Sequence, residues 1–540
     1  MLIFINGLWF AGSMCGVIGV ISRENRNDLG ALLAHGLYQL QNRGDYSAGV
    51  ATIRKLPVSR KQYRVLRQIA VEHTASDFNS MRFEKGHGKV SDVFNTEKLQ
   101  KLVGFMGVGQ VRYPTAGYTI SASQSNLTAE EKELMRLSSI QPLFTPYGKI
   151  IMVHNGDVHN YAELDNYFTG MGIRKAGNND AEVMLKVFSE EFFKYPEDMD
   201  LNSRVEVSVK SVMEKVKATY SCIVAINNIG LVAFRDPEGR RPLFFGVMRE
   251  QDGHDGEITD YAFGSETIAL DKMLFKGTSK ANYSTGRPAF EEIAPGEMLF
   301  ISKDFNVYRT IVKPSSLKFC PFEASYFMRA SSYINNKLVK DIRKDIVELM
   351  WNRFMKTEAY SHIMRHKEIT IICPVPRTAE SAAIHLANKT GLSYNSAIEK
   401  HPYSPRIFMQ PTQEHREVDT IADHSIFREE VNGKYVIIVD DSIVRGTTIK
   451  HDIKYLRNLG AKEVHLFVTF PAIRHPCNHA IDFHTTEELL AHGKTLDEIK
   501  IELGLSAKES LVYATPEELS KAIGLQKQSL CNECYLNGEK

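Results

Sequence analysis

The segment VIIVDDSIVRGTT, residues Val436–Thr448, runs from an apolar strand through two aspartates and a short loop into a helix. The free backbone N–H groups at such a helix N-terminus favour a bound phosphate. The segment lacks the Gly-x-x-x-x-Gly-Lys pattern of nucleoside-triphosphatase loops, and its paired carboxylates suit the vicinal hydroxyls of a sugar. We therefore predict a site for a phosphorylated polyol, with these candidate ligands: Asp440, Asp441, Ser442, Gly446, Thr447 and Thr448.

The sequence around this segment alternates between strands and helices. Apolar strands are expected at 369–373, 435–439 and 464–470, with helices at 379–387 and 448–459. Strands that alternate with helices are typical of βαβ units. The second half of the chain is therefore predicted to be an α/β domain with a parallel sheet.

The first half of the chain has a different pattern. Residues 15–305 contain many short strands, a few helices and turn signals such as Asn155-Gly156. This pattern predicts a layered α+β domain. The polar stretches 53–82 and 118–140 have no clear apolar period, so we expect them to be surface excursions.

Composition excludes several functional classes. The chain has 540 residues, which favours at least two domains. Its 66 basic and 65 acidic residues give a net charge of +1, so nothing predicts binding to nucleic acid or to an anionic membrane surface. No apolar run approaches the roughly 20 residues of a membrane span. Seven cysteines without framework spacing indicate a reducing compartment, and we expect a cytoplasmic protein.

Cys15 precedes a short apolar strand, Gly16–Val20. If Cys15 is the mature first residue, its free α-amino group, with a pKa of about 7.7 to 8.0, is suited to accept the thiol proton. Residues 1–14 would then be a propeptide, or the chain would start at Met14. Taken alone, a cysteine near a chain start is more often inert.

Five downstream segments change that interpretation. They are Arg43–Gly49, Val111–Gly117, His154–Asp157, Asn179–Glu182 and Arg235–Leu243, and they follow the order seen in class II glutamine amidotransferases. The phosphate loop resembles the signature of type I phosphoribosyltransferases. Together, from Met14 to the C-terminus, the chain resembles the glutamine phosphoribosyldiphosphate amidotransferases, also called amidophosphoribosyltransferases.

The resemblance implies a fold and a reaction. The expected fold is a four-layer α+β N-terminal-nucleophile glutaminase domain followed by an α/β type I phosphoribosyltransferase domain. The implied enzyme converts glutamine and 5-phosphoribosyl-1-diphosphate into 5-phosphoribosylamine, diphosphate and glutamate, the first step of purine synthesis. Mg²⁺ would accompany the diphosphate, at Asp440 and Asp441. The family forms homo-oligomers, often tetramers, and is inhibited by purine nucleotides.

The resemblance also implies roles for single residues. Cys15 would be the nucleophile, with Asn155 and Gly156 as the oxyanion hole. Arg112 would hold the α-carboxylate of glutamine and Asp180 its α-amino group. The remaining substrate-binding residues implied are Thr115, Arg377, Lys400, Asp440, Asp441, Ser442, Arg445, Gly446, Thr447 and Thr448.

The other cysteines need a separate explanation. Cys222 and Cys373 lie in apolar strand patterns and are expected in the core. A C-x-x-C pair, Cys531 and Cys534, ends the chain, and by itself it suggests zinc, an iron–sulfur cluster or redox activity about equally. The sequence contexts resemble the Bacillus-type branch of the family, which implies a [4Fe–4S] cluster with no redox part in the reaction, held by Cys320, Cys477, Cys531 and Cys534.

Two departures from the family pattern raise alternatives. Arg377 follows the predicted strand at 369–373, where the family has a small acidic or hydroxyl-rich stretch. The loop expected to close over the substrate keeps Lys400 but has prolines at 402 and 405, which stiffen it. One alternative is an amidotransferase for another phosphosugar acceptor. Another is a non-catalytic paralogue that binds nucleotides and senses redox state through its cluster.

The predicted domains follow from these segments. Residues 15–305 are assigned to the glutamine amidotransferase domain and 306–480 to the phosphoribosyltransferase domain. Residues 481–540 are expected to be a C-terminal helical tail that carries the cluster-binding C-x-x-C pair.

Overall fold

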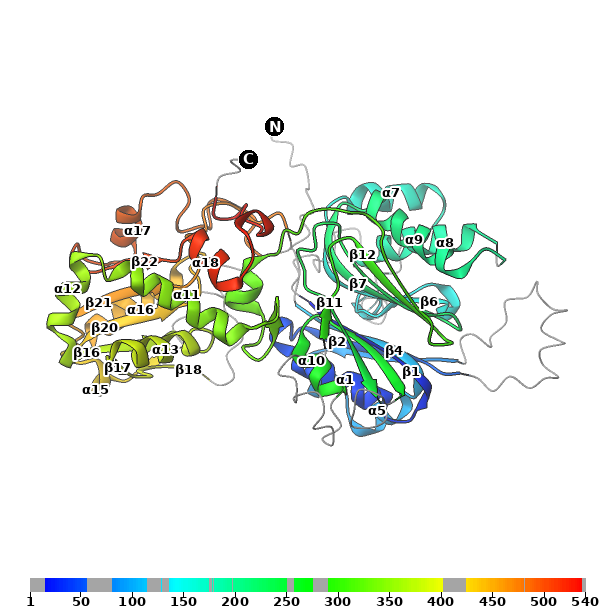
Figure 1. The fold of residues 1–540 in the computed structure, drawn as a ribbon, viewed down its shortest axis with the longest axis horizontal. Coiled ribbons are helices and arrows are strands. Elements are labelled where there is room, and N and C mark those ends of the chain that lie inside the picture. The colour runs from blue at the N-terminus through cyan, green and yellow to red at the C-terminus, as the bar shows by residue number, and fades with distance from the viewer. Residues whose placement is uncertain are drawn as a thin grey trace. The chain divides into compact units, whose positions relative to one another are not determined.

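The computed structural model describes residues 15–55, 80–113, 128, 136–173, 177, 179–196, 198–249, 257–274, 290–401, 424–479 and 481–536. The chain divides into two compact units, Met1–Phe319 and Cys320–Lys540 (Figure 1). Within the described ranges, no helix is both long and apolar enough to cross a membrane.

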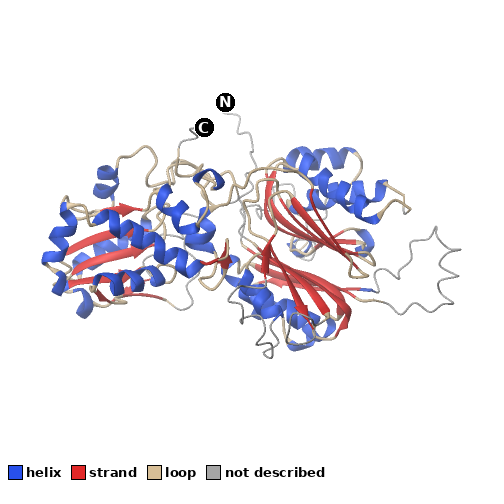
Figure 2. Cartoon of the chain, viewed as in Figure 1, coloured by secondary structure: helices blue, strands red, loops and turns tan. Residues whose placement is uncertain are grey.

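The first unit contains two antiparallel sheets that stack face to face (Figure 2). Among the described residues, the larger sheet has the strand order β11-β9-β10-β1-β4-β2-β3. Its strands are β1 (Gly16–Arg26), β2 (Ser47–Ile53), β3 (Met81–His87), β4 (Gly104–Arg112), β9 (Phe244–Arg249), β10 (Ile258–Gly264) and β11 (Phe290–Glu292).

The second sheet of this unit has the order β13-β12-β8-β7-β6-β5. Its strands are β5 (Leu143–Phe144), β6 (Ile150–Val158), β7 (Ala218–Ile226), β8 (Gly230–Arg235), β12 (Glu297–Ser302) and β13 (Val307–Ile311). Alternate side chains of each strand point to opposite faces of the sheet. Val17 of β1 and Ile151 of β6 therefore meet in the core between the sheets, whereas Ile150 of β6 belongs to the core beneath the helices.

Helices cover the outer faces of both sheets. Helices α1 (Leu29–Gln39) and α10 (Thr267–Leu274) cover the larger sheet, and α7 (Tyr161–Gly170), α8 (Ala181–Lys194) and α9 (Leu201–Lys215) cover the other. The sheets pack closely at Gly19, where an added Cβ would lie 2.7 Å from Cγ2 of Ile223. The four layers, helix–sheet–sheet–helix, confirm the α+β fold expected from the resemblance.

The second unit is built on a parallel sheet with the order β17-β16-β20-β21-β22. The strands are β16 (Thr370–Pro374), β17 (Ser393–Tyr394), β20 (Tyr435–Asp440), β21 (Glu463–Val468) and β22 (Leu511–Tyr513). The expected parallel α/β sheet is confirmed by the pairing of β16 with β20 and of β20 with β21. The described helices and the short outer strands of the unit are α11 (Val339–Phe354), α12 (Glu358–Arg365), α13 (Glu380–Thr390), α15 (Arg428–Val431), α16 (Thr447–Asn458), α17 (Leu496–Glu502), α18 (Pro516–Ile523), β14 (Tyr333–Ile334), β15 (Lys337–Leu338), β18 (Ile398–Lys400) and β19 (His424–Ile426).

The unit boundaries differ from the predicted domain limits. Strand β13 pairs with β12, so residues after 305 complete the second sheet of the first unit, and the division falls between Phe319 and Cys320. The last 60 residues are also more than a helical tail, because β22 adds a parallel strand to β21. In the predicted surface excursion 53–82, the described ends lie in β2 and β3, and most of the rest lies outside the described residues.

Candidate functional site

Cys15 lies directly before β1 and its side chain is buried. Its backbone N–H donates to Oδ1 of Asn155 at 3.1 Å, although the two residues are 140 positions apart. Asn155 lies on β6 of the facing sheet. The stacking of the two sheets therefore brings together the predicted nucleophile and the predicted oxyanion residue.

Asn155 retains an unused hydrogen-bond donor. Its side chain is fully buried, and among the described residues Nδ2 has no hydrogen-bond partner. A buried donor without a protein partner is costly, so Nδ2 is suited to donate a hydrogen bond to an acceptor atom of a ligand. The next residue is Gly156, where a Cβ would lie 1.9 Å from the carbonyl oxygen of Thr219. Only glycine fits there, and this arrangement suits an oxyanion hole made of Asn155 Nδ2 and the Gly156 N–H.

Two charged residues of opposite sign belong to the same unit. Arg112 ends β4, is nearly buried, and donates from Nη1 to the carbonyl oxygen of Ser139 at 2.9 Å. Asp180 is the N-cap residue of α8, and its Oδ2 accepts from the N–H of Val158 at 3.1 Å. An arginine and an aspartate match the α-carboxylate and α-ammonium of an amino acid. Thr115 lies outside the described residues.

Sequence reasoning missed two titratable residues of β6. His154 is buried, and its Nε2 has no partner among the described residues. Burial lowers the pKa of His154. Burial, followed by the negative charge of Asp180, raises the pKa of Asp157 to about 7. Both residues flank Asn155-Gly156 in the sequence, which is the signal that could have drawn attention to them.

The phosphate loop follows β20 as predicted. Asp441 N–H donates to Oδ1 of Asp440 at 2.8 Å, and the Ser442 hydroxyl donates to Oδ1 of Asp441 at 2.7 Å. Burial, together with the charge of Asp441, raises the pKa of Asp440 well above its usual range. A cation or a polyol ligand would stabilise these two carboxylates, because either one replaces hydration lost on folding.

The loop then turns into α16. Gly446 is the N-cap residue, with φ of 79°, a left-handed conformation that favours glycine. Helix α16 begins at Thr447, which Thr448 follows, and no described side chain caps its N-terminus. The arrangement suits a phosphate group. Arg445, predicted to bind substrate, forms an ion pair with Glu488 and donates from Nη2 to the carbonyl oxygen of Asp482 at 3.4 Å.

Arg377 and Lys400 both lie in the second unit. The N–H of Val375 donates to the carbonyl oxygen of Val439 at 2.8 Å, which joins the loop after β16 to the end of β20. Arg377 is exposed two residues farther along this loop, and its peptide bond with Pro376 is cis. Lys400 ends β18 and is partly exposed. Most of the predicted closing loop, 402–423, lies outside the described residues.

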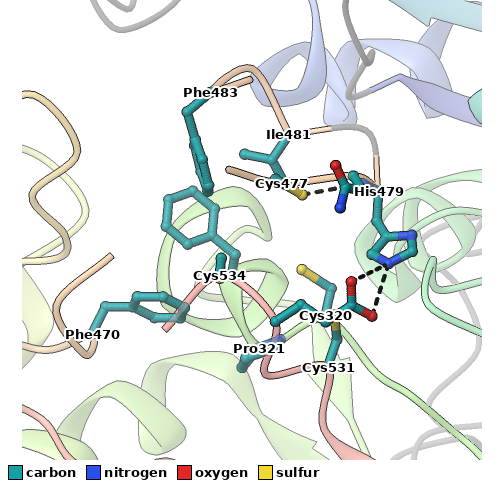
Figure 3. Close-up of a pocket in the computed structure, with 12 residues that line it drawn as sticks. Cys320, Pro321, Phe470, Cys477, His479, Ile481, Phe483, Cys531 and Cys534 are labelled. Atoms are coloured by element: carbon teal, nitrogen blue, oxygen red, sulfur yellow. Dashed lines mark hydrogen bonds and ion pairs between the residues drawn. The ribbon is translucent and has the colours of Figure 1, made fainter. Parts of the chain in front are cut away.

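The four cysteines of the predicted cluster converge. Cys320, Cys477, Cys531 and Cys534 line one pocket, together with Phe322, Phe470, Phe483 and other residues (Figure 3). Burial raises the pKa of Cys534 well above its usual range, and the next largest causes are the charges of the other three cysteines. Four cysteine sulfurs in an apolar pocket are the donor set that iron–sulfur clusters use, so the residues fit such a group.

Two residues at this pocket were not foreseen. His479 donates its backbone N–H to Sγ of Cys477 at 3.3 Å, and its ring Nε2 lies 2.9 Å from the carboxylate of Glu533. The ligand atoms of His479, Cys531 and Glu533 lie within 4.8 Å of one another. Glu533 stands inside the C-x-x-C motif, so its position was visible in the sequence, but its partner was not.

Comparisons with known proteins agree with both units. A family model described as a glutamine amidotransferase domain matches residues 134–272, and one described as a phosphoribosyl transferase domain matches residues 340–499. The amidophosphoribosyltransferase of Methanothermobacter thermautotrophicus is 30% identical over 527 residues, which covers 97% of this chain and 94% of the relative. That of Escherichia coli is 31% identical over 522 residues, covering 94% and 88%.

Solved structures give the same result. The structure described as the allosteric regulatory enzyme of purine biosynthesis has a TM-score of 0.72 at 28% identity and covers 96% of this chain and 95% of its own. The glutamine phosphoribosylpyrophosphate amidotransferase from B. subtilis, complexed with ADP and GMP, has a TM-score of 0.71 at 27% identity, with 96% of each chain covered. From the near-complete match in sequence and in fold, this chain belongs to the amidophosphoribosyltransferase family.

Proposed function

We propose that Cys15 carries the glutaminase half of the family reaction. Its sulfur attacks the side-chain amide carbon of glutamine, and the oxyanion that forms accepts hydrogen bonds from Asn155 Nδ2 and the Gly156 N–H. The carbon–nitrogen bond then breaks and ammonia leaves. Water hydrolyses the glutamyl thioester and releases glutamate. The observation that carries this proposal is the unpartnered Nδ2 of Asn155, whose Oδ1 is already bound to the N–H of Cys15.

The thiol needs a base. The α-amino group of Cys15 serves this purpose once residues 1–14 are absent, because its pKa of about 7.7 to 8.0 leaves much of it neutral near pH 8. The free amine would keep the contact that the Cys15 N–H now makes with Asn155. Asn155 then positions the base as well as stabilising the oxyanion. Arg112 and Asp180 hold the α-carboxylate and the α-ammonium of glutamine.

The second half of the reaction belongs to the phosphate loop. Ammonia attacks C1 of 5-phosphoribosyl-1-diphosphate, diphosphate leaves, and 5-phosphoribosylamine forms. The N-terminus of α16, with Gly446, Thr447 and Thr448, binds the 5-phosphate, and Asp440 and Asp441 accept hydrogen bonds from the ribose hydroxyls. Mg²⁺ would neutralise charge on the diphosphate when it is bound.

The cysteine pocket holds a [4Fe–4S] cluster in this proposal. Cys320, Cys477, Cys531 and Cys534 are its ligands, and they come from three segments distant in sequence. A cluster bound to them would cross-link these segments and add to the stability of the second unit. The reaction as written transfers no electron, so the cluster takes no redox part in it.

Regulation and assembly follow the family. We expect purine nucleotides to inhibit the enzyme, and the support is a solved relative complexed with ADP and GMP. We also expect a homo-oligomer, in the form of a tetramer, and a cytoplasmic location.

Arg377 supports a second candidate acceptor. Arg377 is exposed on the loop after β16. Its planar guanidinium can bind a phosphate through two hydrogen bonds, which the small residue expected at this loop cannot do. Another phosphosugar would then replace 5-phosphoribosyl-1-diphosphate.

One experiment separates the two acceptors. Glutamate and diphosphate are measured together from anaerobically purified protein given glutamine, Mg²⁺ and 5-phosphoribosyl-1-diphosphate. Equal release of both products, lost in Cys15→Ala, supports the family reaction. Glutamate without diphosphate would retain the glutaminase and exclude this acceptor.

A further inference from the structure

Asp157 lies on the same face of β6 as Asn155. The pairing of β6 with β7 continues without a bulge from Ile150 to Val158. Ile151 and Val153 pack between the sheets, whereas Ile150, Met152 and Val158 pack toward the helices. Because strand side chains alternate, Asp157 points to the face of Ile151, Val153 and Asn155, about 6.6 Å along the strand from Asn155.

The side chain of Asp157 is almost fully buried, with 8% of its surface exposed. Asp180 faces it from the N-terminus of α8, Arg241 from the segment after β8, and His159 from the end of β6, with Nε2 3.7 Å from the Asp157 carboxylate. Asp180 is fixed nearby because its Oδ2 accepts from the Val158 N–H. His154, Arg112 and Arg241 interact electrostatically with the same group of residues.

A buried carboxylate, Asp157, with a second, partly exposed carboxylate, Asp180, nearby favours a cationic ligand. Burial and the charge of Asp180 raise the pKa of Asp157 to about 7, while Arg241 opposes the rise. A bound ammonium would favour the ionised form of Asp157. Asn155 Nδ2, on the same face of β6 as Asp157, also supports a ligand there, because it is buried and has no hydrogen-bond partner among the described residues.

We propose that Asp157 is a second carboxylate of the glutamine pocket, which binds the α-ammonium together with Asp180 and so selects α-amino acids over amides that lack this group. The inference rests on the proposed role of Asp180. In the free enzyme near neutral pH, Asp157 is partly protonated. The ammonium binds the ionised form, so binding of glutamine releases a proton, and the affinity rises as the pH increases through about 7.

The test compares two amides. L-glutamine and glutaramate carry the same side-chain amide, but glutaramate has no α-ammonium. Asp157→Asn should lower kcat/KM for glutamine by about tenfold or more, the usual effect of losing a hydrogen bond to a charged group. It should leave glutaramate hydrolysis unchanged and flatten the rise of glutamine kcat/KM near pH 7. The exposed Glu163→Gln, on α7, is the matched control and should behave as the parent enzyme.

Asp180→Asn is measured in parallel. Loss of selectivity in Asp180→Asn but not in Asp157→Asn would overturn this inference alone. Unchanged selectivity in both variants would overturn the ammonium pocket itself. A measurement that needs no change at Asp157 guards against misfolding: glutamine is titrated into Cys15→Ala protein in two buffers with different ionisation enthalpies. Proton release near pH 7 is expected, and its absence would contradict the proposal.

Discussion

The glutamine pocket and the phosphate loop differ in the kind of group that each offers to a ligand. In the glutamine pocket, the unused group is a neutral donor, Asn155 Nδ2, held by a contact with the Cys15 backbone. In the phosphate loop, Asp440 and Asp441 are adjacent acids, of which Asp441 is buried and Asp440 partly exposed, and the pKa of Asp440 is raised well above its usual range. In the proposed function, the first site is preorganised for a negative charge that develops during the reaction. At the second site, a bound ligand or cation would favour the ionised form of Asp440, which burial and the charge of Asp441 disfavour.

The difference means that the two sites should fail independently. Supplied ammonia bypasses the glutaminase, so a defect in the first unit should spare phosphoribosylamine formation from ammonia. A defect in the phosphate loop should spare the hydrolysis of glutamine.

Cys15→Ala removes the proposed nucleophile. Glutamine-dependent activity should fall by at least about 10⁴-fold, because no other group replaces the attacking sulfur. Ammonia-dependent synthesis should persist at the parent rate. The measurement is diphosphate release with either nitrogen donor, and a matching loss with ammonia would show that Cys15 supports the fold or both reactions.

Asn155→Ala removes one of the two proposed oxyanion donors. The glutaminase kcat should fall by about 10²- to 10³-fold, and ammonia-dependent synthesis should remain. Asn166→Ala, at an exposed position of α7, is the control. A change in KM alone would argue that Asn155 binds the substrate without stabilising the transition state.

Asp441→Asn tests the other site. It should lower the use of 5-phosphoribosyl-1-diphosphate by about 10- to 100-fold, the cost of weakened hydrogen bonds between a carboxylate and ligand hydroxyls. Glutaminase activity should be retained. If kcat/KM for the acceptor stays within about twofold of the parent, the carboxylate is not a ligand of the ribose.

Asp440→Asn should change stability in a pH-dependent way. The pKa of Asp440 is raised in the folded protein, so the folded state keeps this proton to a higher pH than the unfolded state does. Asp440 therefore destabilises the folded state increasingly as the pH rises above the unfolded pKa of about 3.9. At pH 8 the free energy of unfolding of the variant should therefore exceed that of the parent by roughly 1 to 3 kcal/mol. The variant should accordingly unfold at a higher temperature. The advantage should disappear at pH 4, and thermal unfolding of ligand-free protein at both pH values checks it.

Some elements of the fold could be predicted from the sequence and others could not, and the difference has physical causes. Local sequence patterns predicted the strand that ends at Asp440 and the helix that begins at Thr447. Neighbouring residues largely determine a buried strand, a loop and the start of a helix, so these elements are visible in the sequence. Cys15 and Asn155 were paired by resemblance alone, since the contact joins two stacked sheets. The membership of β13 in the first unit and of β22 in the parallel sheet depends on partners distant in sequence, and the sequence contains no local signal for either.

The same limit applies to the sites. The convergence of Cys320 and Cys477 with the C-x-x-C pair followed from resemblance, and the structure supports it. Asp157 was missed because its importance comes from Asp180, which reaches the end of β6 from the start of α8. The pair of His479 and Glu533 was missed for the same reason, as it joins two cysteine-bearing segments.

If two separable sites perform the two halves of the reaction, each variant should lose one activity and keep the other. Phosphoribosylamine formation from ammonia and hydrolysis of glutamine are measured in Cys15→Ala and Asp441→Asn under identical conditions. Cys15→Ala should lose only the hydrolysis of glutamine, and Asp441→Asn should be impaired only in the ammonia-dependent synthesis. Loss of both activities in both variants, with the folded protein intact, would contradict the separation of the two sites.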